Sequence, residues 1–139
     1  MGYRKFESEI TVRPDDIDMN NHVHTSRYLD YYLFARYDQM ERCYGIAMEK
    51  FLEHGWTWFV KSCQMEFKRP LVMGETVIVR TWLESFEKSE ACVRFQIIKK
   101  ESGKTAAEGT VLNTMINVAS GRPELIPAWV IAQYTQFTD

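Results

Sequence analysis

A long apolar helix near the start of the chain constrains the fold more than any other feature. The pattern predicts one helix of about five turns, over residues 25–44, that closes at Gly45. Within residues 28–37 only Asp30 and Arg36 are charged, so this part of the helix has no broad polar face. We therefore expect the helix to be buried on most sides, with the rest of the chain wrapped around it.

The remaining sequence is dominated by strand patterns. Residues 5–13 alternate between apolar and polar side chains, which predicts a half-exposed strand that Pro14 ends. Short helices are expected over residues 47–54 and 128–137. Four further segments are rich in Val, Ile, Thr and aromatic residues and are predicted to be strands: 56–67, 75–84, 90–100 and 105–119.

The connections between these segments indicate how the strands pair. The Ser102-Gly103 turn and the break at residues 85–89 are short, and short connections favour antiparallel neighbours. We expect an α+β domain in which a curved antiparallel sheet of about five strands wraps the long central helix. At 139 residues the chain has the size of one domain, so residues 1–139 are expected to form it alone.

Composition excludes several classes of function. A net charge of −2 argues against nucleic acid as a partner, because such binding usually needs a basic face. No segment is apolar enough to span a bilayer, and the first seven residues lack a signal core, so we expect a cytoplasmic protein with no membrane partner. Cys43, Cys63 and Cys92 are odd in number and lack C-x-x-C spacing, which predicts reduced packing residues.

A polar loop directly ahead of the long helix carries the candidate chemistry. Its sequence is Asp16-Ile17-Asp18-Met19-Asn20-Asn21-His22-Val23. A helix N-terminus presents unpaired backbone N–H groups and the positive end of the helix dipole, which can hold a developing negative charge. A carboxylate just upstream can supply a base or a nucleophile. These parts are the ones needed for acyl transfer or hydrolysis.

Three motifs resemble those of a known family. The first is Asp16-x-Asp18-x-x-x-His22-Val23-x-x-x-x-Tyr28-x-x-Tyr31, followed by Phe67-x-Arg69-Pro70-Leu71-x-x-Gly74-Glu75 and Gly121-Arg122-Pro123. Over nearly the whole chain, the pattern resembles the hotdog-fold thioesterases, specifically the 4-hydroxybenzoyl-CoA thioesterase-like family. Asp18-x-Asn20-x-His22 also resembles the acyl-ACP thioesterases. The chain differs from the hydroxybenzoyl pattern at residues 19–22, where that family has Pro-Ala-Gly-Ile.

The resemblance implies a catalytic set for hydrolysis of an acyl-CoA thioester. Asp18 falls at the position of the catalytic carboxylate and could act either as general base or as nucleophile. The carbonyl would be polarised by a backbone N–H near His24 or Thr25, with the resemblance favouring Thr25. Asn20 and His22 would support Asp18, although Asn20 is equally well explained as a turn or cap residue. An acyl-ACP thioesterase and a non-catalytic acyl-binding module remain alternatives.

The resemblance also implies substrate contacts and an oligomer. Tyr28 and Trp58 could line an acyl pocket, although core packing explains them as well. Lys88 and Ser89 match part of a cluster that binds the phosphates of coenzyme A, or Lys88 is a solvated turn lysine. The family places its active sites between subunits, which implies a homodimer or homotetramer. No cofactor is expected, and His22 with His24 lacks the third ligand that a metal site would need.

Overall fold

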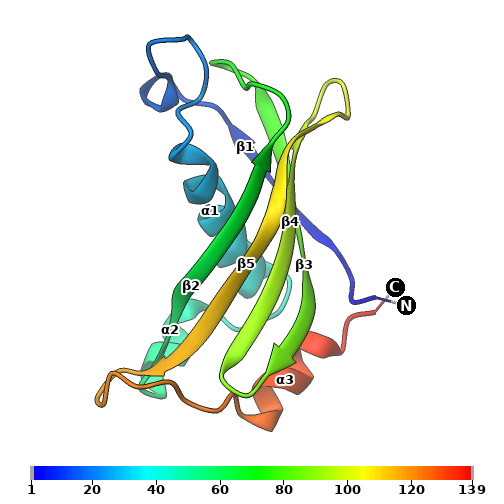
Figure 1. The fold of residues 1–139 in the computed structure, drawn as a ribbon. Helices are drawn as coiled ribbons and strands as arrows, with labels where there is room; N and C mark the ends of the chain where they lie inside the picture. Colours follow the sequence, from blue (N-terminus) through cyan, green and yellow to red (C-terminus); the bar gives the residue numbers. More distant parts are fainter. Residues whose placement is uncertain (1, 139) are drawn as a thin grey trace.

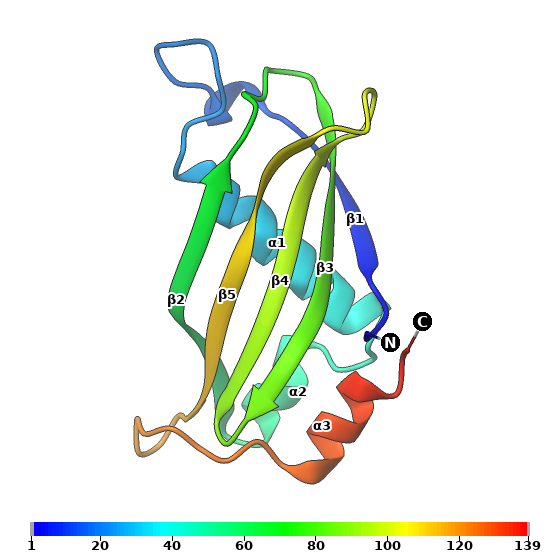
Figure 2. The same ribbon diagram turned by 45° about the vertical axis from the view of Figure 1, so that its right-hand side comes forward.

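The computed structural model describes residues 2–138. Five strands form one antiparallel sheet in the order β1-β3-β4-β5-β2. Their bounds are β1 Phe6–Thr11, β2 Trp56–Phe67, β3 Thr76–Glu87, β4 Glu90–Lys99 and β5 Thr105–Asn117. The sheet curves around the helix α1, Arg27–Arg42, which lies along one face (Figures 1 and 2). The predicted α+β hotdog fold, a curved sheet around a long central helix, is confirmed.

The helix α1 is buried on most sides, as its lack of a polar face requires. Its buried side chains include four aromatic or small residues, Tyr28, Tyr31, Tyr32 and Ala35, and also two long polar ones, Arg36 and Gln39. They pack against the alternate residues of β3 and β4 that point inward, Val77, Val79, Val93, Phe95 and Ile97. The core therefore lies between α1 and the concave face of the sheet.

Strand β3 is longer than its sequence pattern predicts. The expected break at residues 85–89 is a two-residue turn, and β3 continues to Glu87, which pairs with Glu90. A register shift between Leu83 and Ser85 interrupts the alternation of side chains. Because the alternation is broken there, the sequence pattern does not predict the last part of the strand. Lys88 occupies the left-handed region in the turn, at φ 54°.

Strand β2 forms one edge of the sheet. It pairs with β5 from Trp56↔Asn117 to Phe67↔Ala107, with a register shift between Val60 and Ser62. The close approach of the two strands requires Gly109, because a Cβ atom there would lie 1.9 Å from the backbone oxygen of Gln64. Within the described residues the other edge of β2 has no strand beside it, which leaves its backbone groups available for pairing.

Two functional segments lie at opposite ends of the sheet. The loop that precedes α1 lies at one end, beside the connection from β2 to β3 (Figure 1). The β3–β4 turn lies at the other end, next to α2 (Met48–Glu53) and α3 (Ala128–Thr135) (Figure 2). None of the helices in residues 2–138 has the length and apolar character to cross a membrane.

Candidate active site

The loop ahead of α1 is held closed by its own backbone. The Asp18 N–H donates to the His22 carbonyl at 2.8 Å, and the Asn21 N–H donates to the Asp18 carbonyl at 3.1 Å. Ile17 and Val23 form an antiparallel bridge at the base of the loop. Asn21 takes the left-handed conformation that the tight turn needs, at φ 62°, which Asn tolerates better than most residues. The loop is therefore a fixed turn whose side chains have defined positions.

The Asp18 carboxylate is satisfied at only one of its two oxygens. Its Oδ1 accepts the N–H groups of Asn20 at 2.8 Å and His22 at 3.3 Å. Its Oδ2 has no hydrogen-bond donor among residues 2–138. One oxygen thus organises the turn, as the structural interpretation of an Asp here requires. The other oxygen is left to meet a substrate or a water molecule.

The residues just ahead of α1 include one backbone N–H that has no acceptor in residues 2–138. The His24 N–H donates to the Asp16 carbonyl at 2.8 Å, and the Ser26 N–H donates to His24 Nδ1 at 3.1 Å. Across residues 2–138, the Thr25 N–H between them has no acceptor. Of the two backbone groups considered from sequence, His24 is thus already engaged and Thr25 is free. An unpaired N–H at the positive end of a helix can stabilise an oxyanion.

The His24 side chain orders the entry to α1. Ser is a preferred residue at helix starts, but the Ser26 side chain at the N-cap makes no cap hydrogen bond. The Nδ1 of His24 accepts the Ser26 N–H at 3.1 Å. This bond lies ahead of the helix, so His24 positions the N-cap residue and does not itself cap α1.

Asp16 fastens the loop to the helix, a role that sequence analysis missed. Its buried carboxylate Oδ2 accepts the Tyr31 hydroxyl at 2.7 Å and the Arg13 N–H at 3.0 Å. Burial, together with the bond to Asp16, raises the pKa of Tyr31, so this hydroxyl stays protonated and keeps donating. Because the Asp16 carbonyl also accepts the His24 N–H, one residue sets the loop against the first turn of α1.

Four of the residues predicted for the site lie around one groove. Asp18, His22, Thr25 and Tyr28 line a groove of about 300 Å³ together with the end of β2 and the residues that follow it, Phe67, Lys68, Arg69 and Pro70. The ring of Tyr28 packs edge-on against Phe67, with centroids 5.0 Å apart. Burial is the main cause that raises the pKa of the Tyr28 hydroxyl. Lys68 and Arg69 add positive charge that sequence analysis had not assigned to the site.

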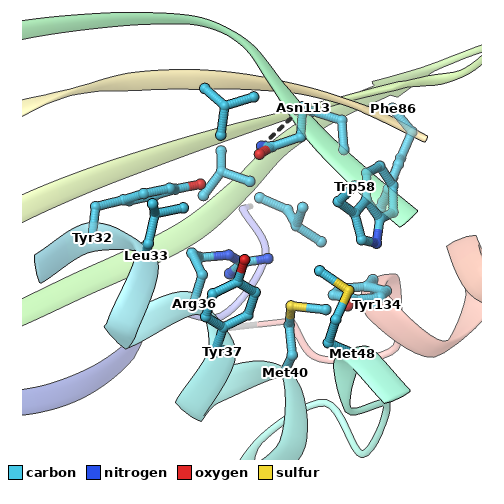
Figure 3. Close-up of a pocket in the computed structure, with 14 residues that line it drawn as sticks. Tyr32, Leu33, Arg36, Tyr37, Met40, Met48, Trp58, Phe86, Asn113 and Tyr134 are labelled. Atoms are coloured by element: carbon cyan, nitrogen blue, oxygen red, sulfur yellow. Dashed lines mark hydrogen bonds between the residues drawn. The ribbon is translucent and has the colours of Figure 1, made fainter. Parts of the chain in front are cut away.

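The other predicted residues lie elsewhere in the chain. Asn20 is exposed and contributes its N–H to Asp18, while its side chain does not line the groove. Trp58 lines a separate cavity against the middle of α1, with Tyr32 and Arg36 (Figure 3). Lys88 and Ser89 form the β3–β4 turn at the far end of the sheet, where the Lys88 carbonyl accepts the Ile126 N–H at 3.0 Å.

Fold and groove together define the class of protein. The antiparallel sheet curved around a central helix is the hotdog fold that the loop motif predicts, and Asp18 and Thr25 line one groove at the start of that helix. The sequence profile of the Thioesterase-like superfamily matches residues 12–134. The chain therefore belongs to this family, and the prediction of a thioester hydrolase is confirmed. Within residues 2–138, no cluster of His, Cys, Asp and Glu is placed to hold a metal ion.

Similar proteins carry the same fold over almost their whole length. The long-chain acyl-CoA thioesterase FadM of Escherichia coli K12 is 20% identical over 112 residues, which are 81% of this chain and 83% of FadM. Slr0204, a 1,4-dihydroxy-2-naphthoyl-CoA thioesterase from Synechocystis, superposes with a TM-score of 0.85 at 16% identity, covering 96% of this chain and 97% of Slr0204. SAV2348 from Staphylococcus aureus, solved in complex with CoA, has a TM-score of 0.84 at 20% identity, covering 100% and 89%.

Proposed function

We propose that this protein is an acyl-CoA thioesterase that hydrolyses an acyl thioester to the free acid and CoA. The observation that carries the proposal is that Thr25, whose N–H has no acceptor in residues 2–138, lines the same groove as Asp18, whose Oδ2 accepts no hydrogen bond there. The carrier is inferred from the similar proteins, since FadM and Slr0204 are CoA thioesterases and SAV2348 binds CoA.

The chemistry follows from placing the thioester carbonyl oxygen on the Thr25 N–H. In one route Asp18 Oδ2 takes a proton from water as the water adds to the carbonyl carbon. The C–S bond of the adduct then breaks and CoA leaves as the thiolate. In the other route Asp18 attacks that carbon itself, the C–S bond breaks to release the CoA thiolate and leave an anhydride, and water then hydrolyses the anhydride. His22 lines the groove as a supporting residue, and the Asn20 N–H helps to hold Asp18 in position.

A two-fold dimer is part of the same proposal. The free edge of β2 and the exposed aromatic residues on β2 and α1, Phe59, Phe67, Phe34 and Tyr37, support pairing of two copies through β2. Antiparallel pairing would bring the β3–β4 turn of the second copy to the end where Asp18 lies. Lys88 and Ser89 lie far from the groove of their own chain, but in this dimer they could hold the phosphates of a CoA bound in the groove of the other copy.

A cytoplasmic location also belongs to this proposal. Cys43, Cys63 and Cys92 are free thiols, and free thiols persist in a reducing compartment. CoA thioesters made there would reach the enzyme without crossing a membrane.

The function is tested by measuring thiol release from matched acyl-CoA and acyl-ACP substrates across acyl chain lengths. We expect turnover of acyl-CoA with the higher kcat/KM. A higher kcat/KM for acyl-ACP would show that ACP, and not CoA, carries the preferred acyl group. If no substrate released thiol while acyl-CoA still bound, the protein would be a binding module and the proposed hydrolysis would be wrong.

A further inference from the structure

A small cavity beside the middle of α1 contains a buried cation without a counter-charge. The cavity has a volume of about 60 Å³, and its walls come from α1, the sheet, Met48 and Tyr134. Arg36 lines it and is only 8% exposed. Figure 3 shows the Arg36 side chain between Tyr37 and the sheet, with Met40 and Met48 below it. The other wall residues are mostly apolar.

Arg36 is unlike the less buried arginines of the chain. Five of those pair with a carboxylate: Arg13, Arg27, Arg42, Arg80 and Arg94. Arg36 forms no ion pair with any carboxylate in residues 2–138. Its Nη1 donates to Thr81 Oγ1 at 3.0 Å, and the guanidinium carbon lies 5.4 Å from the centre of the Tyr44 ring. A guanidinium has five N–H donors, and the Thr81 bond and the interaction with the Tyr44 side chain leave part of this hydrogen-bonding capacity unused within residues 2–138.

A second polar group in the same cavity lacks a partner. The Tyr32 hydroxyl is buried, with the residue 1% exposed. The Asn113 side chain lies near it, but no group in residues 2–138 makes a hydrogen bond of normal geometry with it. Figure 3 shows this hydroxyl directed toward the interior on the Asn113 side of the cavity. Buried polar groups are almost always paired, and leaving one unpaired costs free energy. A ligand with oxygen acceptors would satisfy both Tyr32 and Arg36.

The cavity lies in line with the groove along one helix face. Tyr28 in the groove and Tyr32 and Arg36 in the cavity are spaced by four residues, so they occupy the same face of α1. From Tyr28 to Arg36 the helix rises about 12 Å. To reach Arg36 along this face, an acyl chain whose thioester lies at Thr25 would pass between the sheet and the buried rings of Tyr28 and Tyr32.

The volume of the Arg36 cavity limits the size of the group that can bind in it. The cavity of about 60 Å³ exceeds what one water molecule needs, and it is well below the roughly 150 Å³ of a cavity that takes benzene. It therefore suits a small end group and not an aromatic ring. A carboxylate has that size, carries the charge that Arg36 lacks, and accepts hydrogen bonds.

We propose that the Arg36 cavity binds a carboxylate at the far end of the acyl group, so that the preferred substrates are CoA thioesters of dicarboxylic acids. This inference rests on the proposed thioesterase function. It assigns to Arg36 the discrimination between chains that end in a carboxylate and chains that end in a methyl group. Tyr32 assists by donating its hydroxyl to the same carboxylate.

The test compares kcat/KM for pairs of acyl-CoAs of equal length that end in carboxylate or methyl. We expect the carboxylate-to-methyl ratio to pass through a maximum above 10 at the length that reaches Arg36. In Arg36→Met this ratio should fall by about 10- to 100-fold, the effect of losing a hydrogen bond to a charged group. Arg94→Met removes an exposed arginine of the sheet and should leave the ratio unchanged.

If Arg36→Met does not fold, a second variant, Tyr32→Phe, can test the same proposal. Tyr32→Phe should lower the ratio and, without ligand, raise the melting temperature, because it removes an unpaired buried hydroxyl. A merely structural role for Tyr32 would not move the ratio. Wild-type hydrolysis with a ratio of 1 or less at every length would overturn the inference and leave the thioesterase function standing.

Binding without turnover separates the two proposals. If no acyl-CoA is hydrolysed, the thermal shift produced by pentanoate is compared with that of 1-pentanol. A shift by pentanoate alone that disappears in Tyr32→Phe or Arg36→Met supports the carboxylate site while the proposed function falls. Equal shifts by both compounds would overturn the carboxylate site as well.

Discussion

The groove and the cavity along α1 differ in how their polar groups are satisfied. In the groove, two backbone N–H groups donate to Asp18 Oδ1, and the Tyr31 hydroxyl donates to Asp16 in the same loop. These hydrogen bonds fix the position of the Asp18 carboxylate. In the cavity, Arg36 has one oxygen partner and the Tyr32 hydroxyl has none. The groove is thus organised before a ligand arrives, whereas the cavity keeps unpaired groups that a ligand would complete.

Replacing Asp18 should give the largest effect. Asp18→Asn keeps an oxygen that can accept the N–H groups of Asn20 and His22, so the turn and the KM should change little. The kcat should fall by about 10²- to 10⁴-fold, because the base or nucleophile is lost. Steady-state kinetics with acyl-CoA measure both. The exposed Asp15, which pairs only with Arg13, provides the matched control, and Asp15→Asn should keep full activity. An Asp18→Asn enzyme with normal kcat would remove Asp18 from the mechanism.

Two neighbouring tyrosines allow a hydrogen-bonded hydroxyl and an unpaired hydroxyl to be compared by their effect on stability. Tyr31→Phe leaves the buried Asp16 carboxylate without its hydroxyl donor and should lower the free energy of unfolding by about 1–3 kcal/mol. Tyr32→Phe removes a hydroxyl that has no partner and should raise the free energy of unfolding by up to about 1 kcal/mol. Urea denaturation of ligand-free protein measures both values. Changes of the same sign in the two variants would contradict the contrast.

The smallest effects are expected at the basic residues that could bind CoA phosphates. Lys88→Glu and Arg69→Glu should each raise the KM for acyl-CoA a few-fold, as expected for an exposed ion pair worth up to about 1 kcal/mol. Neither should alter the KM for the short pantetheine thioester of the same acid, which lacks those phosphates. Equal changes for both substrates would exclude a phosphate contact at that residue.

Mixing two inactive or weakened chains tests whether two copies share one groove. Heterodimers of Asp18→Asn and Lys88→Glu chains would contain one groove with both native residues if Lys88 reaches the groove of the other copy. The mixture should then recover low-KM turnover that neither parent shows. No recovery in a mixture shown by sedimentation to contain heterodimers would place Lys88 outside the groove of the second copy.

The residues of the groove could be predicted together because they are close in sequence. Asp18, His22, Thr25 and Tyr28 fall within eleven consecutive positions, so one motif fixes their order and spacing. The role of Asp16 was missed, since nothing in a sequence reveals that its carboxylate meets a tyrosine fifteen residues downstream. The bond from the Ser26 N–H to His24 Nδ1 was missed for a related reason, because sequence preferences count residue types and not ring geometry.

The cavity could not be predicted in this way. Its residues come from all three α-helices and from β2, β3, β4 and β5. Their meeting depends on the order of strands in the sheet, which alternation patterns do not encode. Sequence patterns did predict the antiparallel sheet and the central helix. In the strands, alternate residues are buried, so apolar and polar residues alternate in the sequence. Arg36 broke the apolar pattern of the helix, but a lone charge there gave no sign that it would lack a partner.

A complex with an acyl-CoA analogue that has a ketone in place of the thioester tests the central claim most directly. The structure should place the ketone oxygen within hydrogen-bond distance of the Thr25 N–H, with Asp18 Oδ2 facing the carbonyl carbon or a water molecule next to it. A ketone bound away from Thr25, with the Asp18 carboxylate turned to solvent, would contradict the assignment of this groove as the active site.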